Sequence, residues 1–250
     1  MIPMSSRACS PCTVALATSV KGNSPVNPTL VTLTIGQSPR SDILPLLLQY
    51  LPAEKIAHAG LLDGLNRQQI AQQFGAHDGD KVLVSRLSDG SQVLLASDKV
   101  ENGLRKRILQ LEDRGFETIL LLCTGEFGRL YTNRALLLEP DRMIPPLIAA
   151  MVGEHDVGIV VPVARQIQQQ AGKWKNLPRP PCFAVASPYL SSDEALLDAG
   201  RSLQDCGADV VVLDCFGYHC QHRDMLSRQL AIPILLSGEI VARLAAELLL

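Results

Sequence analysis

Short apolar runs alternate with longer amphipathic segments from residue 30 onward. Short runs rich in Val, Ile and Leu that close at a turn residue are typical of buried parallel strands, whereas apolar residues spaced three and four apart indicate helices. The predicted strands are 30–35, 56–61, 118–123, 134–138, 157–163, 181–186, 209–215 and 233–236. The predicted helices are 43–50, 66–74, 99–114, 143–152, 166–173, 193–206, 223–230 and 239–249.

This alternation of strands and helices predicts an α/β protein, because it produces parallel sheets with helices on both faces. The cycle restarts near Asp156, so we expect two pseudo-symmetric, Rossmann-like parallel-sheet lobes with an interlobe cleft. The expected first lobe covers 28–153 and is joined by the C-terminal helix 237–250, while the second covers 154–236. Within the first lobe, Ser-Asp-Gly-Ser at 88–91 is a hairpin signal between two apolar runs.

Two of the predicted strands end alike. The segments 118–125 and 209–217 are each an apolar run that reaches a cysteine, Cys123 or Cys215, with glycine two positions later. Ligands of open α/β sheets bind just beyond the carboxyl ends of the strands. The two thiols are therefore expected to face one cleft, and such a pair suggests acid/base chemistry without a cofactor.

Composition narrows the classes of partner. The chain has 250 residues, of which 47% are apolar and 19% charged, with a net charge of −2. This balance predicts no general attraction to nucleic acid or to an anionic membrane. No apolar run approaches the roughly 18 residues of a membrane helix. We expect no nucleic-acid or membrane partner, a small carboxylate as ligand, and allow for a homodimer.

Residues 1–27 are rich in Ser, Pro, Thr and Asn and are expected to form a mobile N-terminal extension. Cys9 and Cys12 within it lack the second ligand pair of a zinc site and the strand–helix context of a redox motif. The chain has seven cysteines, an odd number, several of them in apolar strands. This usage predicts a reduced, cytoplasmic protein.

Several separated motifs carry a family resemblance. They are Leu-Thr-Ile-Gly-Gln-Ser-Pro-Arg at 33–40, Glu-Pro-Asp-Arg-Met-Ile-Pro-Pro at 139–146 and Leu-Asp-Cys-Phe-Gly-Tyr-His at 213–219, together with the closing segment 236–248. From about residue 30 onward the chain strongly resembles the AroM protein family. That name implies no particular reaction.

The AroM family is in turn similar to the Asp/Glu/hydantoin racemase superfamily. This more distant resemblance implies two α/β lobes that contribute one cysteine each, and Cys123 and Cys215 fall on those positions. The sequence departs from the superfamily pattern at three neighbours. Thr124 stands where asparagine is usual, and Asp214 and Phe216 flank the second cysteine where small residues are usual.

The resemblance implies a racemase, isomerase or decarboxylase-like reaction at the α-carbon of a small carboxylate. Racemisation requires a base on one face of the carbon and an acid on the other, which a thiolate and a thiol can supply. Cys123 and Cys215 are the expected catalytic pair. Strand-end amides and the 37–41 turn are expected to hold the carboxylate. The expected substrate-binding residues are Gln37, Ser38, Arg40, Thr124, Gly125, Phe216, Gly217, Tyr218 and His219, and Gln166 is a further polar candidate.

Other interpretations stay open. The protein could be a non-catalytic ligand-binding or regulatory protein that retains the cleft, and free cysteines are often small buried hydrophobes. The latter interpretation is preferred for Cys182 and Cys206. Three roles are open for Asp214. Its carboxylate would raise the pKa of Cys215 if the two are close in space, or it would have a structural role on the opposite face of the strand. Alternatively, it would replace part of the acid/base chemistry of the thiols. Neither a metal site around His219 and His222 nor a nucleotide-binding motif is expected, so no cofactor is predicted.

Overall fold

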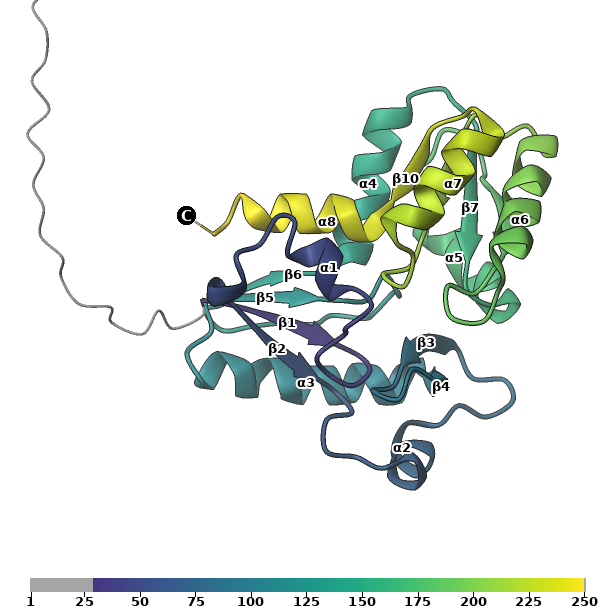
Figure 1. Cartoon of the computed structure of the whole chain (residues 1–250). Helices are drawn as coiled ribbons and strands as arrows, with labels where there is room; N and C mark the ends of the chain where they lie inside the picture. Colours follow the sequence, from purple (N-terminus) through teal and green to yellow (C-terminus); the bar gives the residue numbers. More distant parts are fainter. Residues whose placement is uncertain (1–28, 250) are drawn as a thin grey trace, which may run out of the picture.

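Two four-stranded parallel sheets form the two lobes of the described part of the chain (Figure 1). The first contains β1 (Leu30–Thr34), β2 (Ile56–Gly60), β5 (Thr118–Leu121) and β6 (Leu136–Leu138) in the order β2-β1-β5-β6. The second contains β7 (Val157–Val161), β8 (Cys182–Val185), β9 (Val210–Leu213) and β10 (Ile234–Leu236) in the order β8-β7-β9-β10. In each sheet the first strand is flanked by the second and third. The predicted α/β fold with two pseudo-symmetric lobes is confirmed.

Eight α-helices and a hairpin complete the described residues, which the computed structural model places over 29–249. The helices are α1 (Leu44–Leu47), α2 (Arg67–Phe74), α3 (Ser97–Asp113), α4 (Pro140–Val152), α5 (Ile167–Lys173), α6 (Asp193–Asp205), α7 (Cys220–Leu230) and α8 (Ser237–Ala246), with short 3-10 turns η1 (Ala53–Lys55) and η2 (Ala164–Gln166). The expected extension 1–27, with Cys9 and Cys12, lies outside the described residues. Over 29–249, no helix has the length and apolar character that crossing a bilayer requires.

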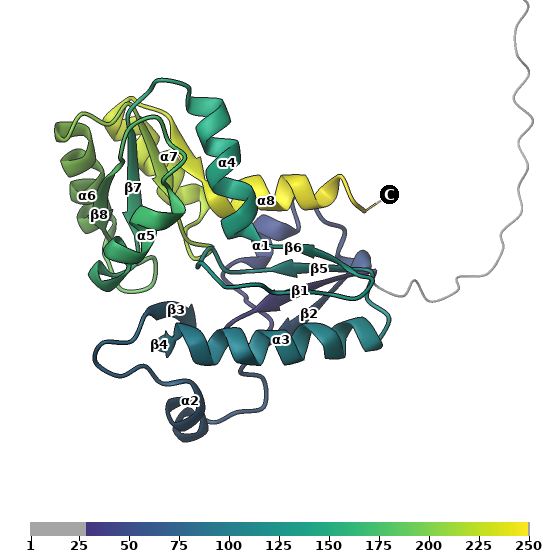
Figure 2. The ribbon, with the colours of Figure 1, turned by 180° about the vertical axis from the view of Figure 1, so that it is seen from behind.

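One hydrophobic core runs through both lobes. All five residues of β1 and of β7 are buried, as expected for strands covered on both faces. The core that covers them contains Leu120 of the first sheet and Val212 of the second, together with Ile148 of α4 and Val241 of α8. Helix α8 also contacts α1, and Figure 2 shows α4 beside the second sheet while α8 extends over the first. Each lobe is thus covered by a helix that follows the other lobe's last strand.

The predicted helix 43–50 is shorter in the structure. Only α1, a single turn, is regular, and residues 48–50 continue it as a looser turn. The amides of Gln49 and Tyr50 bond to carbonyls three residues back instead of four. A proline at position 52 follows, and the residue before a proline is disfavoured in helical conformation.

The hairpin of β3 (Val82–Arg86) and β4 (Gln92–Ala96) belongs to the first lobe and contacts the second. Gly90 in its turn has φ of 87°, a conformation that favours glycine. Gln92 Oε1 accepts a hydrogen bond from Ser187 Oγ at 2.6 Å, and Gln166 Nε2 donates to Val82 O at 3.3 Å. The second lobe has no counterpart of this hairpin in its described strand order, so the pseudo-symmetry is broken here.

A buried ion pair of the second lobe is hydrogen-bonded to the first lobe. Lys173, at the end of α5 in the second lobe, lies 2.5 Å from Asp214 Oδ2, and both side chains are almost fully buried. The same ammonium donates to Thr124 O of the first lobe at 2.7 Å. Thr124 Oγ1 in turn donates to Asp214 O at 3.1 Å, and Ser237 Oγ to Asp214 Oδ1 at 3.3 Å. Asp214 is therefore committed to holding the lobes together.

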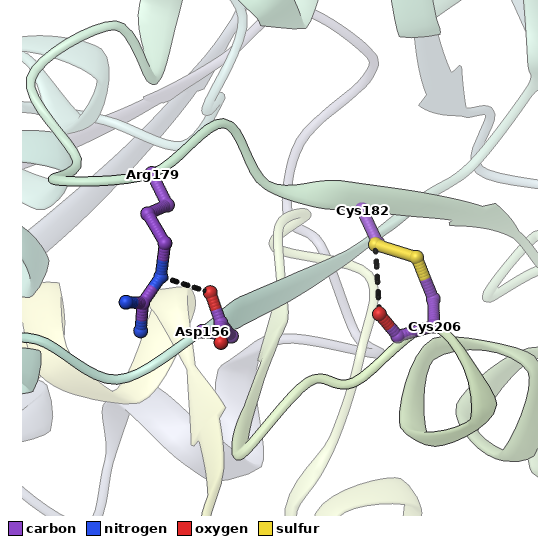
Figure 3. The surroundings of a disulfide bond; sticks show 4 residues. All are labelled: Asp156, Arg179, Cys182 and Cys206. Carbon is purple, nitrogen blue, oxygen red and sulfur yellow. Dashed lines mark hydrogen bonds and ion pairs between the residues drawn. A yellow bond between two sulfur atoms is a disulfide. The ribbon is translucent and has the colours of Figure 1, made fainter.

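Cys182 and Cys206 form a disulfide, which corrects the expectation that both are free buried thiols in a reduced protein. Figure 3 shows the bond between the start of β8 and the residue after α6, close to the ion pair of Arg179 with Asp156. Residue 206 is exposed and 182 half-buried, so neither is enclosed in the core. Sequence reasoning missed the pairing because it depends on the return of α6 to the edge strand. Cys123, Cys215 and Cys220 are free.

Reduction of this disulfide should destabilise the second lobe. The bond closes a loop with a sequence separation of 24, and loops of this size contribute about 3 kcal/mol through the entropy of the unfolded chain. We expect Cys206→Ser to lower the free energy of urea unfolding by about that amount. Cys220→Ser, which alters a free thiol, is the matched control. Equal stability of oxidised and reduced wild-type protein would contradict this prediction.

Removing one partner of the central ion pair should cost far more stability than removing an exposed one. Lys173→Met leaves the Asp214 carboxylate buried without its partner, so we expect a loss of about 3–5 kcal/mol in urea unfolding. Adding Asp214→Leu should recover most of that loss, because no buried charge then remains. Arg201→Met breaks an exposed pair with Asp198 and should change stability by less than about 1 kcal/mol. An equal loss of stability in Lys173→Met and Arg201→Met would contradict a stabilising role of the central ion pair.

Candidate active site

Cys123 and Cys215 occupy equivalent places in the two lobes. Each lies two residues beyond the end of the third strand of its sheet, β5 or β9. Both line one small cavity between the lobes, with a volume of about 20 Å³. The strands of both sheets run toward the boundary between the lobes, so the carboxyl ends of β5 and β9 meet at this cavity (Figure 1).

The loop that follows each strand holds its sulfur in the same way. The backbone N–H of Gly125 donates to Cys123 Sγ at 3.3 Å, and that of Gly217 donates to Cys215 Sγ at 3.4 Å. A side chain at either glycine would collide with its surroundings. A Cβ on Gly125 would lie 2.3 Å from Leu83 Cδ2. A side chain at either position would have to displace Leu83 or Tyr189, and each Cys-x-Gly turn offers a hydrogen bond that favours the ionised sulfur.

Arg40 brings a positive charge to the cavity from the loop after β1. Its guanidinium is buried and forms two hydrogen bonds with the Asp42 carboxylate, at 2.9 and 2.7 Å. Burial alone would raise the pKa of Asp42, but the hydrogen bonds and charge of Arg40 lower it below its usual value. Arg40 Nη2 also donates to the hydroxyl of Tyr189 at 2.9 Å. Tyr189 follows β8, so this contact crosses from one lobe to the other.

Both thiols are protonated at neutral pH in this closed arrangement. Burial raises the pKa of Cys123 to about 12; the Gly125 amide opposes the increase, and the charges of Cys215 and Asp141 add to it. Burial also raises the pKa of Cys215, while the Gly217 amide and Arg40 oppose that increase. Asp141, in the first turn of α4, has a pKa raised to about 6 by its own burial. Its Oδ1 finds no hydrogen-bond partner among the described residues.

Some of the expected substrate-binding residues line the cavity and others do not. Those that line it with the two cysteines are Arg40, Thr124, Gly125 and Phe216. Gln37 instead braces the hairpin, accepting bonds from the amide and hydroxyl of Ser88 at 2.9 Å. Ser38 bonds to the Asp63 carboxylate through its amide and hydroxyl, both at 2.7 Å. Contrary to the expectation, neither side chain contributes to the cavity surface.

The residues after Gly217 are also structural. Tyr218 is fully buried, and its hydroxyl donates to Ala186 O at 2.5 Å. His219 is the N-cap of α7, in a reciprocal capping arrangement with the ring of His222, which accepts from the His219 amide at 3.0 Å. Burial lowers the pKa of both histidines, so both are neutral at pH 7. Gly217, Tyr218 and His219 thus shape the loop behind Cys215 and do not line the cavity.

Sequence reasoning missed several residues that do line the cavity. They are Leu83, Val84, Leu122, Pro162, Gln170 and Tyr189, and Asp214, which was considered beside Cys215, also lines it. Tyr189 lies just beyond the carboxyl end of β8, a position that strand topology alone marks as part of a ligand site. Leu83 and Val84 come from the hairpin, whose placement over the cleft has no local sequence signal. Gln166 lines the cavity as proposed, and its Oε1 is buried without a partner among the described residues.

A larger cavity of about 510 Å³ adjoins the thiol cavity and shares four of its lining residues. The shared residues are Leu83, Gly125, Gln166 and Gln170. Its outer wall carries the carboxylates of Asp80, Asp98, Glu101 and Glu126. This outer cavity lies between the hairpin, the loop after Cys123 and α5. Across residues 29–249, no three His, Cys, Asp or Glu side chains gather closely enough to hold a metal ion.

Solved structures of racemases and of a decarboxylase share this two-lobed fold. Glutamate racemase from Francisella tularensis in complex with D-glutamate aligns with a TM-score of 0.57 and 11% identity, over 89% of this chain and 81% of that one. Allantoin racemase from Pseudomonas fluorescens aligns with a TM-score of 0.54 and 15% identity, over 88% and 89%. Arylmalonate decarboxylase aligns with a TM-score of 0.51 and 11% identity, over 88% and 91%. At such identities the likeness establishes the fold alone.

Sequence comparison gives the family. No curated protein matches the chain. The sequence profile of the family described as AroM protein matches residues 30–249, which include both cysteine loops, Arg40 and Lys173. The motifs at 33–40 and 139–146 that suggested this family fall within the matched region. Because the profile spans most of the sequence, this chain belongs to the AroM family.

Proposed function

We propose that this protein is a cofactor-independent racemase or isomerase that moves a proton at the α-carbon of a small carboxylate, with Cys123 and Cys215 as paired acid and base. One observation carries the proposal: two free thiols at equivalent strand ends of pseudo-symmetric lobes line one cavity. Each also accepts the same backbone hydrogen bond. A pair of groups on opposite sides of a bound carbon is what a two-base proton transfer requires.

The reaction would proceed in two proton transfers. One sulfur, as thiolate, takes the α-proton and becomes a thiol, and the electron pair of the broken C–H bond is delocalised into the adjacent carboxylate. The opposite thiol then donates its proton to the other face of the carbon and becomes a thiolate. The raised pKa values fit a difficult substrate, because a thiolate that forms against burial is a stronger base toward a weakly acidic C–H.

The carboxylate would be held at the Arg40 side of the cavity. Arg40, Thr124 and Phe216 all line the cavity, and Arg40 brings the positive charge. A volume of about 20 Å³ accommodates little more than one water molecule. Substrate binding therefore requires the cavity to widen toward the outer cavity, which has about 510 Å³ of space.

The alternative is a non-catalytic protein that binds a small carboxylate in the same cleft. Two observations favour it: both thiols have raised pKa values, and Asp214 is used in a structural ion pair. A binding protein needs the cavity and Arg40 but neither thiol. Deuterium exchange at the α-carbon of a bound carboxylate separates the alternatives, since only the enzyme catalyses it.

We propose a cytoplasmic location on the sequence pattern, with a small carboxylate as ligand and a homodimer as the assembly to test by light scattering. The Cys182–Cys206 disulfide is the feature that argues against a reducing compartment. The redox state of this pair, trapped by alkylation of intact cells, tests the location. A fully oxidised pair in cells would exclude the proposed cytoplasmic location unless that cytoplasm is itself oxidising.

Replacing either cavity cysteine should abolish proton exchange while sparing ligand binding. For a carboxylate identified by thermal-shift screening, we expect Cys123→Ser and Cys215→Ser each to slow α-proton exchange in D₂O by about 10²–10⁴-fold. The hydroxyl is a far weaker acid and base partner than the thiol, while its size is similar. Cys220→Ser is the matched control and should exchange at the wild-type rate.

The dissociation constant should change little in all three variants. If NMR shows α-proton exchange at the wild-type rate in both Cys123→Ser and Cys215→Ser, the two-thiol mechanism is wrong. No exchange in the wild-type protein with a ligand that clearly binds would favour the binding-protein alternative.

The rate of α-proton exchange should increase as the pH is raised. Because burial raises the pKa of both thiols above the ordinary value, only a small thiolate fraction exists near pH 7, and that fraction grows tenfold per pH unit. We expect the exchange rate to rise by about tenfold per unit from pH 7 to 9. Higher pH is less informative, because a thiol kept neutral by the fold contributes stability that is lost above its unfolded pKa of about 8.5. A rate independent of pH over this range would contradict thiolate as the base.

A further inference from the structure

The two glycines that follow the cavity cysteines leave equivalent gaps, and different side chains fill them. Leu83 of the hairpin occupies the gap at Gly125, with its Cδ2 2.3 Å from where a Cβ would lie. Tyr189 occupies the gap at Gly217, with its Cζ and hydroxyl oxygen each 2.5 Å from the corresponding position. One thiol of the pseudo-symmetric pair thus has a methyl group beside its loop, and the other has a phenol.

The phenol of Tyr189 is oriented toward the sulfur by Arg40. The Tyr189 hydroxyl accepts a hydrogen bond from Arg40 Nη2 at 2.9 Å and lies 3.9 Å from Cys215 Sγ. A guanidinium can only donate, so the phenol oxygen is the acceptor in that bond and keeps its own proton for another partner. When Cys215 is ionised, its sulfur can only accept. The geometry then forms a continuous chain from Arg40 through Tyr189 to the thiolate.

The charged groups around the two sulfurs also favour ionisation of Cys215 over ionisation of Cys123. Around Cys215, Arg40 and Tyr189 favour the thiolate, and Asp214 on its own strand opposes it. Burial keeps the neighbouring phenols of Tyr189 and Tyr218 neutral by raising their pKa values.

Around Cys123, the Lys173 ammonium favours the thiolate, but that group is already bonded to Asp214 and to Thr124 O. Asp141 of α4 opposes ionisation, as does Cys215 across the cavity. Among the residues that the structure describes, the Gly125 amide alone donates a hydrogen bond to Cys123 Sγ.

We propose that Tyr189, held by Arg40, is a positioning residue for Cys215 that makes it the first of the two thiols to ionise, so that the singly ionised enzyme has Cys215 as its base and Cys123 as its acid. The assignment of base and acid rests on the proposed function; the order of ionisation does not. In the reaction, the Cys215 thiolate takes the α-proton and the Cys123 thiol supplies one to the opposite face. The enzyme then holds its thiolate at Cys123, and loss of the Cys215 proton to solvent with uptake of a proton by Cys123 restores the form that reacts.

Site-resolved alkylation tests the order of ionisation without a substrate. The full-length protein is treated with iodoacetamide at a series of pH values, and the modification of each cysteine peptide is followed by mass spectrometry. The pH dependence of each rate gives an apparent pKa whatever the absolute accessibility of the thiol, since only the thiolate reacts. We expect the Cys215 rate to reach its plateau at a lower pH than the Cys123 rate.

Tyr189→Phe isolates the hydroxyl. The substitution keeps the ring that fills the Gly217 gap and lies against Arg40, and it removes the hydroxyl that accepts from Arg40 and can donate to Cys215. A hydrogen bond to a charged group is strong enough that its loss should lower the thiolate fraction of Cys215 at a given pH by about tenfold. The apparent pKa of Cys123 should not change. If an exchanged substrate is found, the pH profile of exchange should move upward by the same amount.

Tyr218→Phe is the matched control. It removes the hydroxyl of another buried tyrosine near Cys215, but one that bonds to Ala186 O. It should leave the Cys215 titration unchanged, and the unfolding midpoint of each variant shows that folded proteins are being compared.

The proposal is overturned by any of three results: Cys123 ionises first or together with Cys215 in the wild type, Tyr189→Phe shifts nothing, or Tyr218→Phe shifts Cys215 equally. A failure of α-proton exchange with the expected order of ionisation would instead overturn the proposed function and leave the thiol order standing.

Discussion

The geometry of the whole site depends on the ammonium group of Lys173. It is buried with the Asp214 carboxylate and the Thr124 carbonyl, which are the immediate neighbours of Cys215 and Cys123 in sequence. One cation therefore bonds to both cysteine loops. A buried charge pair is costly to separate because each partner alone is poorly solvated. The clamp is strong for this reason, and the same bonds limit how far the cleft can open between the two cysteine loops.

The site combines a symmetric frame with asymmetric contents. The two sheets repeat the same strand order, and the two Cys-x-Gly loops repeat the same amide–sulfur bond. The differences come from elements that the frame does not duplicate, namely the hairpin that supplies Leu83 and the loop that supplies Tyr189. A duplicated fold can thus present two chemically identical side chains and still surround them with different neighbours.

The sequence predicted the strands and helices of the two lobes better than the residues that line the cavity between them. Local apolar periodicity located nearly every strand and helix, and the repeated cysteine segments marked the two strand ends that meet. Long-range contacts decided the rest. Nothing local in Tyr189 or Lys173 indicates a partner in the other lobe, and the Cys182–Cys206 pairing depends on how α6 returns to the sheet. Gln37 and Ser38 were expected at the site because their turn lies at a strand end, but their side chains bond outward to the hairpin and to Asp63.

The exchange of covering helices between the lobes has a consequence for biosynthesis. Helix α8 is made after every other described element, yet its apolar face packs into the core with α1 of the first lobe. During translation the first sheet must wait for about one hundred further residues, or roughly 5–20 s at ordinary elongation rates, before that face is covered. The nascent first lobe is therefore a natural client for chaperones that shield exposed apolar surface. Premature termination before residue 237 would leave it permanently in that state.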